Sequence, residues 1–359
     1  MKKIAESLKL RKKSSVLLVY TGGTIGMVQD LKTSRLKPFN FSHLTDQIPE
    51  LKKFDINLSS VSFEKPIDSS NMHPEVWMKL ARLIEKNYDK HDGFVILHGS
   101  DTMSYTASAL SFMLENLNKP VVLTGSQLPI GTIRTDGKEN LITAIEIAAA
   151  KKNDRPVVPE VCIYFEYQLY RGNRTHKFNS EYFQAFQSSN YPTLAEAGVH
   201  IKYNFQAIEN TVEKQFRVHY QLDTNIAVLK IFPGITQNVV EAILGIKNLK
   251  ALIIETFGSG NAPTDKWLME LLKKAIDKGL IIYNVTQCNA GSVDQGKYET
   301  SATLQNIGVI GGADITTEAA VTKLMFLLGN YNSKNEIKKL LQVPIRGELS
   351  IKGQSEAHE

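Results

Sequence analysis

Short apolar runs alternate along the first half of the chain with segments whose apolar residues recur at helical spacing. The runs VLLVY, FVIL, VVLTG and VCIYF are typical of buried strands. Between them, Leu110 to Leu117 and residues 138–152 follow the period of a helix. This alternation predicts a parallel sheet covered by helices on both faces, in βαβ units that continue to residue 203.

The pattern changes between residues 204 and 224, where charges are interspersed and apolar residues alternate from Phe216 to Leu222. We interpret this segment as a linker, after which a smaller α/β pattern begins with IAVLKIFPG. The predicted fold class is therefore α/β, with a larger N-terminal parallel-sheet domain and a smaller C-terminal α/β domain. The predicted boundaries are a basic disordered tail over 1–13, domains over 14–203 and 225–350, the linker over 204–224, and a tail over 351–359.

Composition and charge narrow the classes of function. The chain has 359 residues and two cysteines, Cys162 and Cys288, too few for a disulfide framework or a C-x-x-C metal site. We therefore expect a reducing compartment. The formal net charge of +5 resides in residues 1–13, which hold six basic residues and one acid. The neutral remainder argues against nucleic-acid binding, which usually needs a basic face on the folded domain.

The start of the chain predicts no secretion. It is basic, but it lacks the apolar block of about 7 to 15 residues that a signal peptide needs. No window approaches the roughly 18 apolar residues of a membrane span. We therefore expect a soluble, cytoplasmic protein without a membrane partner.

Polar residues follow several predicted strands, where the loops of an open parallel sheet build a site. They are Thr21–Thr24, Asp68–Asn71 and His98–Thr102. A phosphate cradle is one interpretation of TGGTIG, but Gly22, Gly23 and Gly26 lack the G-x-G-x-x-G spacing. The other interpretation from the residues alone is a turn capped by threonines.

Four motifs occur together in a fixed order: YTGGTIGM from residue 20, DSSNM from 68, LHGSDTM from 97 and LYRGNRTHK from 169. The set resembles the bacterial-type L-asparaginases, most closely their cytoplasmic type I branch. The similarity continues through GSGNAP, GVIGGAD and RGELS. The resemblance implies a flavodoxin-like N-terminal domain and a homodimer or homotetramer. In such dimers the active sites lie between subunits, so the resemblance also implies that the 258–263 loop of a neighbour lines the pocket.

The resemblance also implies roles for individual residues. Thr21 is the expected nucleophile, and Ser100, Asp101 and Lys177 form the expected proton-transfer group, with Ser100 where the family has threonine. Substrate binding falls to Asp68, Ser69 and Ser70, together with Ser100 and with Asp101, which would hold the α-ammonium group. No metal or cofactor is implied.

Neighbouring residues receive structural predictions. Thr24 is expected to cap the turn, and His98 to be buried and hydrogen bonded, because neighbours along an extended chain point to opposite sides and cannot form a triad. Cys288 is expected to be a small buried residue. Leu36 occupies the position where the family carries a tyrosine on a flexible loop.

Regulation is a further expectation from the resemblance. Some type I asparaginases bind asparagine at an allosteric site, and the matching positions here read His176, Glu255 and Cys288. The family has an arginine where this chain has Glu255. Glutamate reverses the charge offered to the carboxylate of the effector, so we expect no allosteric control.

The predicted function is hydrolysis of L-asparagine to L-aspartate and ammonia through a threonine acyl-enzyme. Two alternatives share this chemistry: a glutaminase or asparaginase of mixed specificity, and an ammonia-supplying amidotransferase subunit that acts on a charged tRNA. The rivals from another class are a nucleotide-dependent oxidoreductase and a non-catalytic small-ligand binder that uses the glycine loop.

Overall fold

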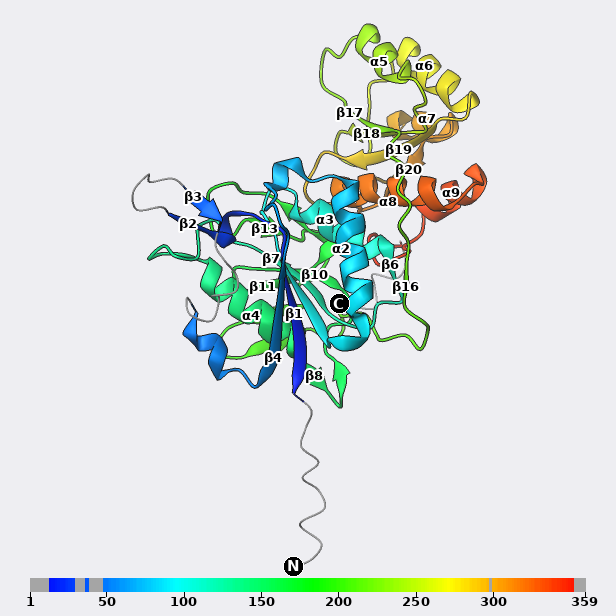
Figure 1. The fold of residues 1–359 in the computed structure, drawn as a ribbon. Coiled ribbons are helices and arrows are strands. Elements are labelled where there is room, and N and C mark those ends of the chain that lie inside the picture. Colours follow the sequence, from blue (N-terminus) through cyan, green and yellow to red (C-terminus); the bar gives the residue numbers. More distant parts are fainter. Residues whose placement is uncertain (1–12, 30–35, 39–47, 297–298, 352–359) are drawn as a thin grey trace, which may run out of the picture.

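The computed structural model describes residues 13–29, 36–38, 48–296 and 299–351. Figure 1 shows a larger α/β part formed by the N-terminal half of the chain and a smaller one formed by the C-terminal third, which confirms the predicted fold class. The predicted tails lie outside the described residues, except for Lys13 and Ile351. Among the described helices, none is long and apolar enough to cross a membrane.

The larger sheet has a parallel core of five strands. In chain order, these strands lie 2-1-3-4-5 across the sheet, which is the flavodoxin-like order that the resemblance implied. The order reverses between the first and third strands, where a doubly wound sheet has its ligand crevice. The five strands are β1 (Ser14–Tyr20), β4 (Ile56–Ser62), β5 (Gly93–Leu97), β7 (Val121–Thr124) and β10 (Val161–Phe165).

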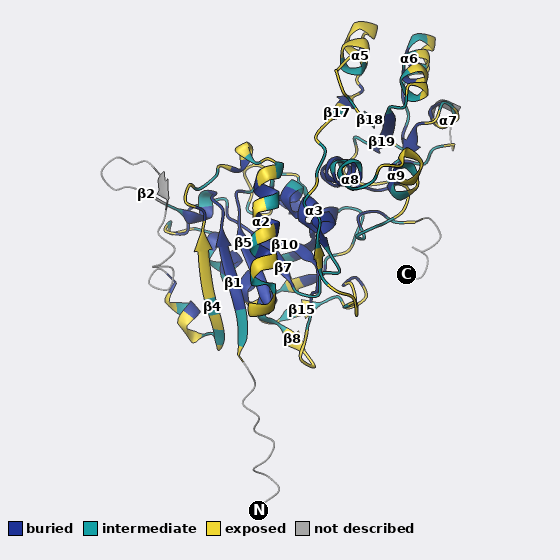
Figure 2. Cartoon of the chain, turned by 45° about the vertical axis from the view of Figure 1, so that its right-hand side comes forward, coloured by how far each residue is buried: buried dark blue, intermediate teal, exposed yellow. Residues whose placement is uncertain are grey.

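Helices cover both faces of this sheet. Alternate residues of β1 pack on opposite faces, with Leu18 in the core beside α4 (Gly137–Ala149) and Val19 in the core beside the other two helices. Those two are α2 (Pro74–Asn87) and α3 (Met103–Met113). The central strands are consequently buried on both sides, as Figure 2 shows. Apolar runs without alternation follow from this arrangement.

The prediction that βαβ units continue to residue 203 was wrong beyond β10. The chain turns back at Glu166 and Tyr167, which have positive φ of 44° and 67°. The following strands pair antiparallel at this edge of the sheet. A two-residue turn in which both residues have positive φ joins antiparallel strands without a crossover helix. Asparagine and glycine are the usual residues in such a turn, but this chain has Glu166 and Tyr167 there. The added strands are β11 (Gln168–Arg171), β14 (Ala195–Ala197) and β15 (Ile201–Tyr203).

The segment predicted as a linker packs along the larger part. The ring of Phe216 stacks on Tyr88 with centroids 3.8 Å apart, and β16 (Arg217–Val218) pairs with β6 (Leu114–Glu115) after α3. The rest of residues 204–224 forms loops. Its role as a boundary between two domains stays a prediction.

The smaller part is a four-stranded parallel sheet whose strands lie in chain order. They are β17 (Ile226–Lys230), β18 (Ala251–Thr256), β19 (Ile281–Thr286) and β20 (Ile310–Gly311). Its helices are α5 (Gln237–Leu244), α6 (Lys266–Asp277), α7 (Glu299–Asn306), α8 (Thr317–Asn330) and α9 (Lys334–Leu341). Helices α5 and α6 pack on one face of this sheet, and α8 and α9 pack on the other face.

Helix α8 joins the two parts. It packs on the small sheet and also on α3, where the rings of Phe112 and Phe326 lie 6.0 Å apart. Figure 1 shows α8 between the two sheets. The two parts therefore share an apolar contact.

Short elements complete the fold. The small hairpins pair β2 (Met27–Gln29) with β3 (Leu36–Pro38), β8 (Lys151–Lys152) with β9 (Arg155–Pro156), and β12 (His176–Lys177) with β13 (Phe186–Gln187). Single 3₁₀ turns are η1 (Thr24–Gly26), η3 (Pro49–Lys53), η4 (Ser69–Asn71), η5 (Tyr88–Lys90) and η6 (Gly172–Arg174). Several of these turns build the candidate site.

Candidate active site

Thr21 lies where β1 ends, at the point where the strand order reverses. Its backbone N–H and its Oγ1 both donate to the carbonyl of Leu97, at 3.0 and 2.9 Å, which ties it to the end of β5. Its own carbonyl accepts from the N–H of Ile67 at 2.8 Å. The side chain is 1% exposed. The ends of two other chain segments therefore fix Thr21 at the switch point of the sheet, and the carbonyl of Leu97 holds its hydroxyl.

The two glycines after Thr21 are required by close backbone contacts. A Cβ on Gly22 would lie 2.1 Å from the carbonyl oxygen of Ile67, and one on Gly23 would lie 2.5 Å from the nitrogen of Gly99. Both glycines have positive φ, at 139° and 88°. The prediction that Thr24 caps this turn was wrong: η1 starts at Thr24, its N-cap is Gly23, and no side chain caps it. The backbone geometry of the glycines shapes the turn instead.

Ser100, Asp101 and Lys177 form one hydrogen-bonded group. Lys177 Nζ donates to Ser100 Oγ at 2.8 Å and to Asp101 Oδ1 at 2.5 Å. The side chain of Lys177 is 15% exposed, whereas that of Asp101 is 64% exposed. The structure thus brings Lys177 to the adjacent Ser100 and Asp101, which precede it by more than seventy positions, and leaves the carboxylate of Asp101 open to a ligand.

The DSSNM segment forms η4 against the same loop. Asp68 caps this turn by accepting from the N–H of Ser70 at 3.0 Å and from its hydroxyl at 2.8 Å, and these bonds lower the pKa of the Asp68 carboxyl. Ser69 is buried, its carbonyl accepts from Thr102 Oγ1 at 2.7 Å, and its side chain lies against Gly99. Asp68 and Ser70 are exposed.

His98 is confirmed as a buried, hydrogen-bonded residue. Its Nδ1 lies 2.6 Å from the carbonyl of Gly99, and its Nε2 lies 2.9 Å from Thr106 Oγ1. The indole N–H of Trp77 donates to the oxygen of the same hydroxyl at 3.0 Å, so the hydroxyl of Thr106 is free to donate its own proton to Nε2 of His98. Burial lowers the pKa of His98 to about 4. This histidine is therefore neutral and satisfied, and it takes no part in a Ser-His-Asp triad.

Gln127 is a site residue that sequence reasoning missed. It follows β7, and its Oε1 lies 3.5 Å from Ser100 Oγ. Its backbone N–H donates to the carboxylate of Asp136, and its Nε2 donates to the carbonyl of Tyr182 at 3.0 Å. The signal that could have found it is its place in the loop after VVLTG, at the carboxyl edge of the parallel sheet.

Two of the three residues expected at a regulatory site contact the start of α8. His176 Nδ1 contacts Glu318 Oε1 at 2.5 Å, and this bond raises the pKa of the imidazole. Glu255 accepts from Thr317 Oγ1 at 2.8 Å. The prediction that Cys288 is buried was wrong, because it lies in the exposed loop after β19. His176 and Glu255 are thus engaged by the protein itself.

Two further expectations concern a metal ion and the loop tyrosine of the family. Among the described residues, no group of three or more His, Cys, Asp or Glu side chains could hold a metal ion. Of the stretch SRLKPF, where Leu36 matches the tyrosine of the family, the structure describes only residues 36–38, and the side chain of Leu36 lies outside the described part.

Two family models match the chain. Residues 15–209 match "Asparaginase, N-terminal", and residues 225–341 match "Glutaminase/Asparaginase C-terminal domain". The chain belongs to the asparaginase family. The membership confirms the resemblance drawn from the four ordered motifs and makes the protein an amidohydrolase.

Relatives agree with this assignment. This chain is 43% identical to L-asparaginase 1 of Escherichia coli, and the match covers 94% of this chain and 98% of that protein. It is 39% identical to the 60 kDa lysophospholipase of Mus musculus, of which it covers 62%. The crystal structure of L-asparaginase I from Vibrio cholerae superposes with a TM-score of 0.85 at 40% identity, over 94% of this chain and 100% of that one.

Proposed function

We propose that this protein hydrolyses the side-chain amide of L-asparagine to give L-aspartate and ammonia. The observation that carries the proposal is the position of Thr21, whose hydroxyl is held at the switch point of the sheet by the carbonyl of Leu97. The Ser100, Asp101 and Lys177 group supplies the proton-transfer chemistry that such a hydroxyl needs. The similarity to L-asparaginases supports the choice of substrate.

The reaction proceeds in two steps. Thr21 Oγ1 bonds to the side-chain carbonyl carbon, and its proton passes through the group of Ser100 and Lys177 to the departing nitrogen. The C–N bond breaks and ammonia leaves an aspartyl ester on Thr21. Water then adds to the ester, and Thr21 Oγ1 recovers a proton as aspartate is released. This sequence uses no metal or cofactor.

Charge explains the selection of a free amino acid. Asp101 reaches solvent on one side while it pairs with Lys177 on the other, so it can accept a substrate ammonium group. Asp68 stays ionised because Ser70 donates two hydrogen bonds to it. Ser69 and Ser70 complete this binding segment. An amide without an α-ammonium group lacks these contacts.

The location, assembly and domain boundaries of the protein are proposed in the same way. We propose a cytoplasmic homodimer or homotetramer, with the 258–263 loop of a neighbour lining the pocket and with the domain boundaries given above. Mixed glutaminase and asparaginase specificity is the second candidate, because the C-terminal family model bears both names. An ammonia-supplying amidotransferase subunit is the third candidate, and the neutral charge of the chain beyond residue 13 opposes it.

One experiment separates these candidates. Ammonia release is measured with L-asparagine, L-glutamine and D-asparagine as substrates. The proposal expects the highest kcat/KM for L-asparagine, and comparable values for glutamine would favour mixed specificity. Absence of ammonia from all three amides would refute hydrolysis of a free amino-acid amide. Light scattering of the purified protein tests the oligomer.

A further inference from the structure

The C-terminal segment 344–350, here called the strap, is bound by a buried arginine of the larger part. Arg174, the last residue of η6, is 3% exposed. Its Nε donates to the carbonyl of Gly347 at 2.8 Å, its Nη2 to Ser350 Oγ at 2.9 Å, and its Nη1 to Asp314 Oδ2 at 2.9 Å. Asp314 belongs to the loop between β20 and α8. Arg174 therefore links the larger part to the smaller part and to the strap.

The smaller part holds the strap from the other side. Lys323 of α8 pairs with Glu348 at 2.5 Å, and both side chains are fully buried. The carboxylate of Glu348 also accepts from the backbone N–H groups of Ile345 and Arg346, which bends the strap into a turn. Breaking a buried pair leaves an uncompensated charge, so this anchor is strong.

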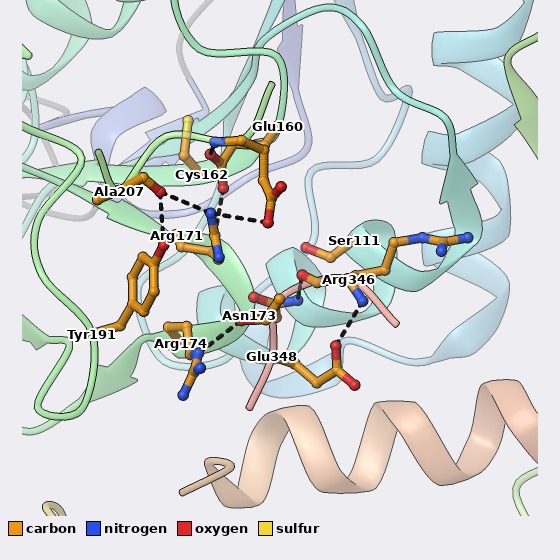
Figure 3. A network of polar contacts seen from close by, with 12 residues as sticks. Ser111, Glu160, Cys162, Arg171, Asn173, Arg174, Tyr191, Ala207, Arg346 and Glu348 are labelled. Carbon is orange, nitrogen blue, oxygen red and sulfur yellow. Dashed lines mark hydrogen bonds and ion pairs between the residues drawn. The ribbon is translucent and has the colours of Figure 1, made fainter. Parts of the chain in front are cut away.

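Two cavities flank the strap, with volumes of about 390 and about 410 Å³. Pro344, Gly347 and Arg171 line both of them. Figure 3 shows the polar side chains that surround the strap, with Arg171 and Arg174 beside the ring of Tyr191. Polar anchors therefore act together with the apolar packing of Ile345 and Leu349 to fix the course of this segment.

The same anchors fix the backbone that leads to Lys177. Thr175 is buried, and its Oγ1 donates to the carbonyl of Arg171 at 2.6 Å, which closes the turn after Arg174. His176 contacts Glu318 in the first turn of α8. Asp314 and Glu318 of the smaller part thus bind Arg174 and His176, two of the three residues before Lys177. The Nζ of Lys177 then donates to Ser100 and Asp101.

We propose that Arg174 is a positioning residue for Lys177, through which Asp314 and the strap set where the lysine amine stands relative to Ser100 and Asp101. The inference rests on the proposed function, in which Lys177 transfers protons. A displacement of about 1 Å at a reacting group costs on the order of 10²-fold in rate. The bonds of 2.8 and 2.5 Å made by Lys177 leave little room for such a shift.

Three variants test the proposal through kcat and KM for L-asparagine. Arg174→Met is expected to lower kcat by about 10- to 100-fold and to change KM by less than about threefold, because Asp101 stays in place. Arg174→Lys is expected to recover part of the loss, because an ammonium group can still pair with Asp314. Arg171→Met is the matched control: Arg171 is equally buried, but it pairs with Glu160 and Glu209. This control is expected to lower the unfolding temperature and to keep kcat within about twofold.

A double-variant comparison separates positioning from general damage. In a Lys177→Met background, Arg174→Met is expected to change the residual rate by less than about twofold, because residues that act as a unit are not additive. A full multiplicative loss in that background would overturn the proposal. So would an unchanged kcat in folded Arg174→Met. Should Arg174→Met fail to fold, Arg174→Lys and Ser350→Ala carry the same comparison, with smaller expected losses in kcat that should again vanish in the Lys177→Met background.

Chemical labelling reports the position of Lys177 without activity. Acetic anhydride followed by peptide mass spectrometry gives the acetylation rate of this lysine, whose side chain is mostly buried. Arg174→Met is expected to raise that rate several-fold, whereas Arg171→Met should leave it unchanged. An unchanged rate in both variants would overturn the positioning role. Failure of the wild-type protein to release ammonia would instead refute the proposed function. The acetylation rates would then still test whether Arg174 positions Lys177.

Discussion

Replacement of Thr21 separates catalysis from folding more sharply than any other change. The Leu97 carbonyl accepts from both the backbone N–H and the Oγ1 of Thr21, so Thr21→Ala leaves this acceptor paired. One hydrogen bond is lost, at about 1 kcal/mol, and one buried methyl group, at about another 1 kcal/mol. The free energy of unfolding should therefore fall by only about 2 kcal/mol, a change that a domain of this size tolerates.

The activity of the same variant should fall much further. Thr21→Ala removes the oxygen that bonds to the substrate, so ammonia release should drop by about 10³-fold or more while thermal unfolding remains cooperative. Thr21→Ser keeps the oxygen and should retain measurable turnover. Acid quenching during turnover should trap an aspartyl ester on the peptide that contains residue 21 of the wild-type protein. If Thr21→Ala kept even about a tenth of the wild-type kcat, Thr21 would not be the nucleophile.

Three further predictions concern the same region. Ser100→Ala should cost about 10²-fold in kcat, and its combination with Lys177→Met should be little worse than either change alone; a multiplicative loss would show that they act independently. Initial rates over two decades of asparagine at about pH 7.5 should follow a hyperbola with a Hill coefficient of about 1, whereas sigmoidicity that disappears in Glu255→Ala would reveal an effector site. The bond to Glu318 raises the pKa of His176 in the folded protein above its value in the unfolded chain. The pair therefore stabilises the fold fully at a pH below the unfolded-state pKa of His176, and this stabilisation is lost as the pH rises through the folded-state pKa. The difference in free energy of unfolding between wild type and His176→Gln should therefore shrink in urea titrations from about pH 5 to about pH 9, and a difference that grows would contradict the reasoning.

The central strands and their loops could be predicted from the sequence because they are continuous apolar runs followed by polar residues. The run VLLVY is buried on both sides in β1, and Thr21 directly after it lies at the switch point of the sheet. The order of the strands is not encoded in any single run. It came from the family resemblance, and the structure confirmed it.

The antiparallel edge could not be predicted because its turn uses unusual residues. Glu166 and Tyr167 adopt positive φ, which asparagine and glycine would have signalled. Cys288 was misplaced for a different reason: cysteine is more often buried than exposed, and composition does not show that β19 ends two residues earlier. Gln127 was missed because its neighbours in space come from three different loops.

Contacts between distant parts of the chain were also beyond sequence reasoning. Arg174 and Ser350 are separated by 176 positions, and nothing in either local pattern indicates the partner. The local sequence indicates which residues form a turn. A hydrogen bond between two turns, such as that between Arg174 and Ser350, depends on how the whole chain folds.

The strap also has a consequence for the order of events during synthesis. Residues 344–350 are translated after Arg174, Asp314 and Lys323, to which they bind. Because domains generally fold as units while the chain emerges from the ribosome, the two sheets can form before the strap arrives. The segment that carries Lys177 then still lacks one of its anchors. We therefore expect a nascent chain to fix the position of Lys177 only after residues 344–350 have bound Arg174.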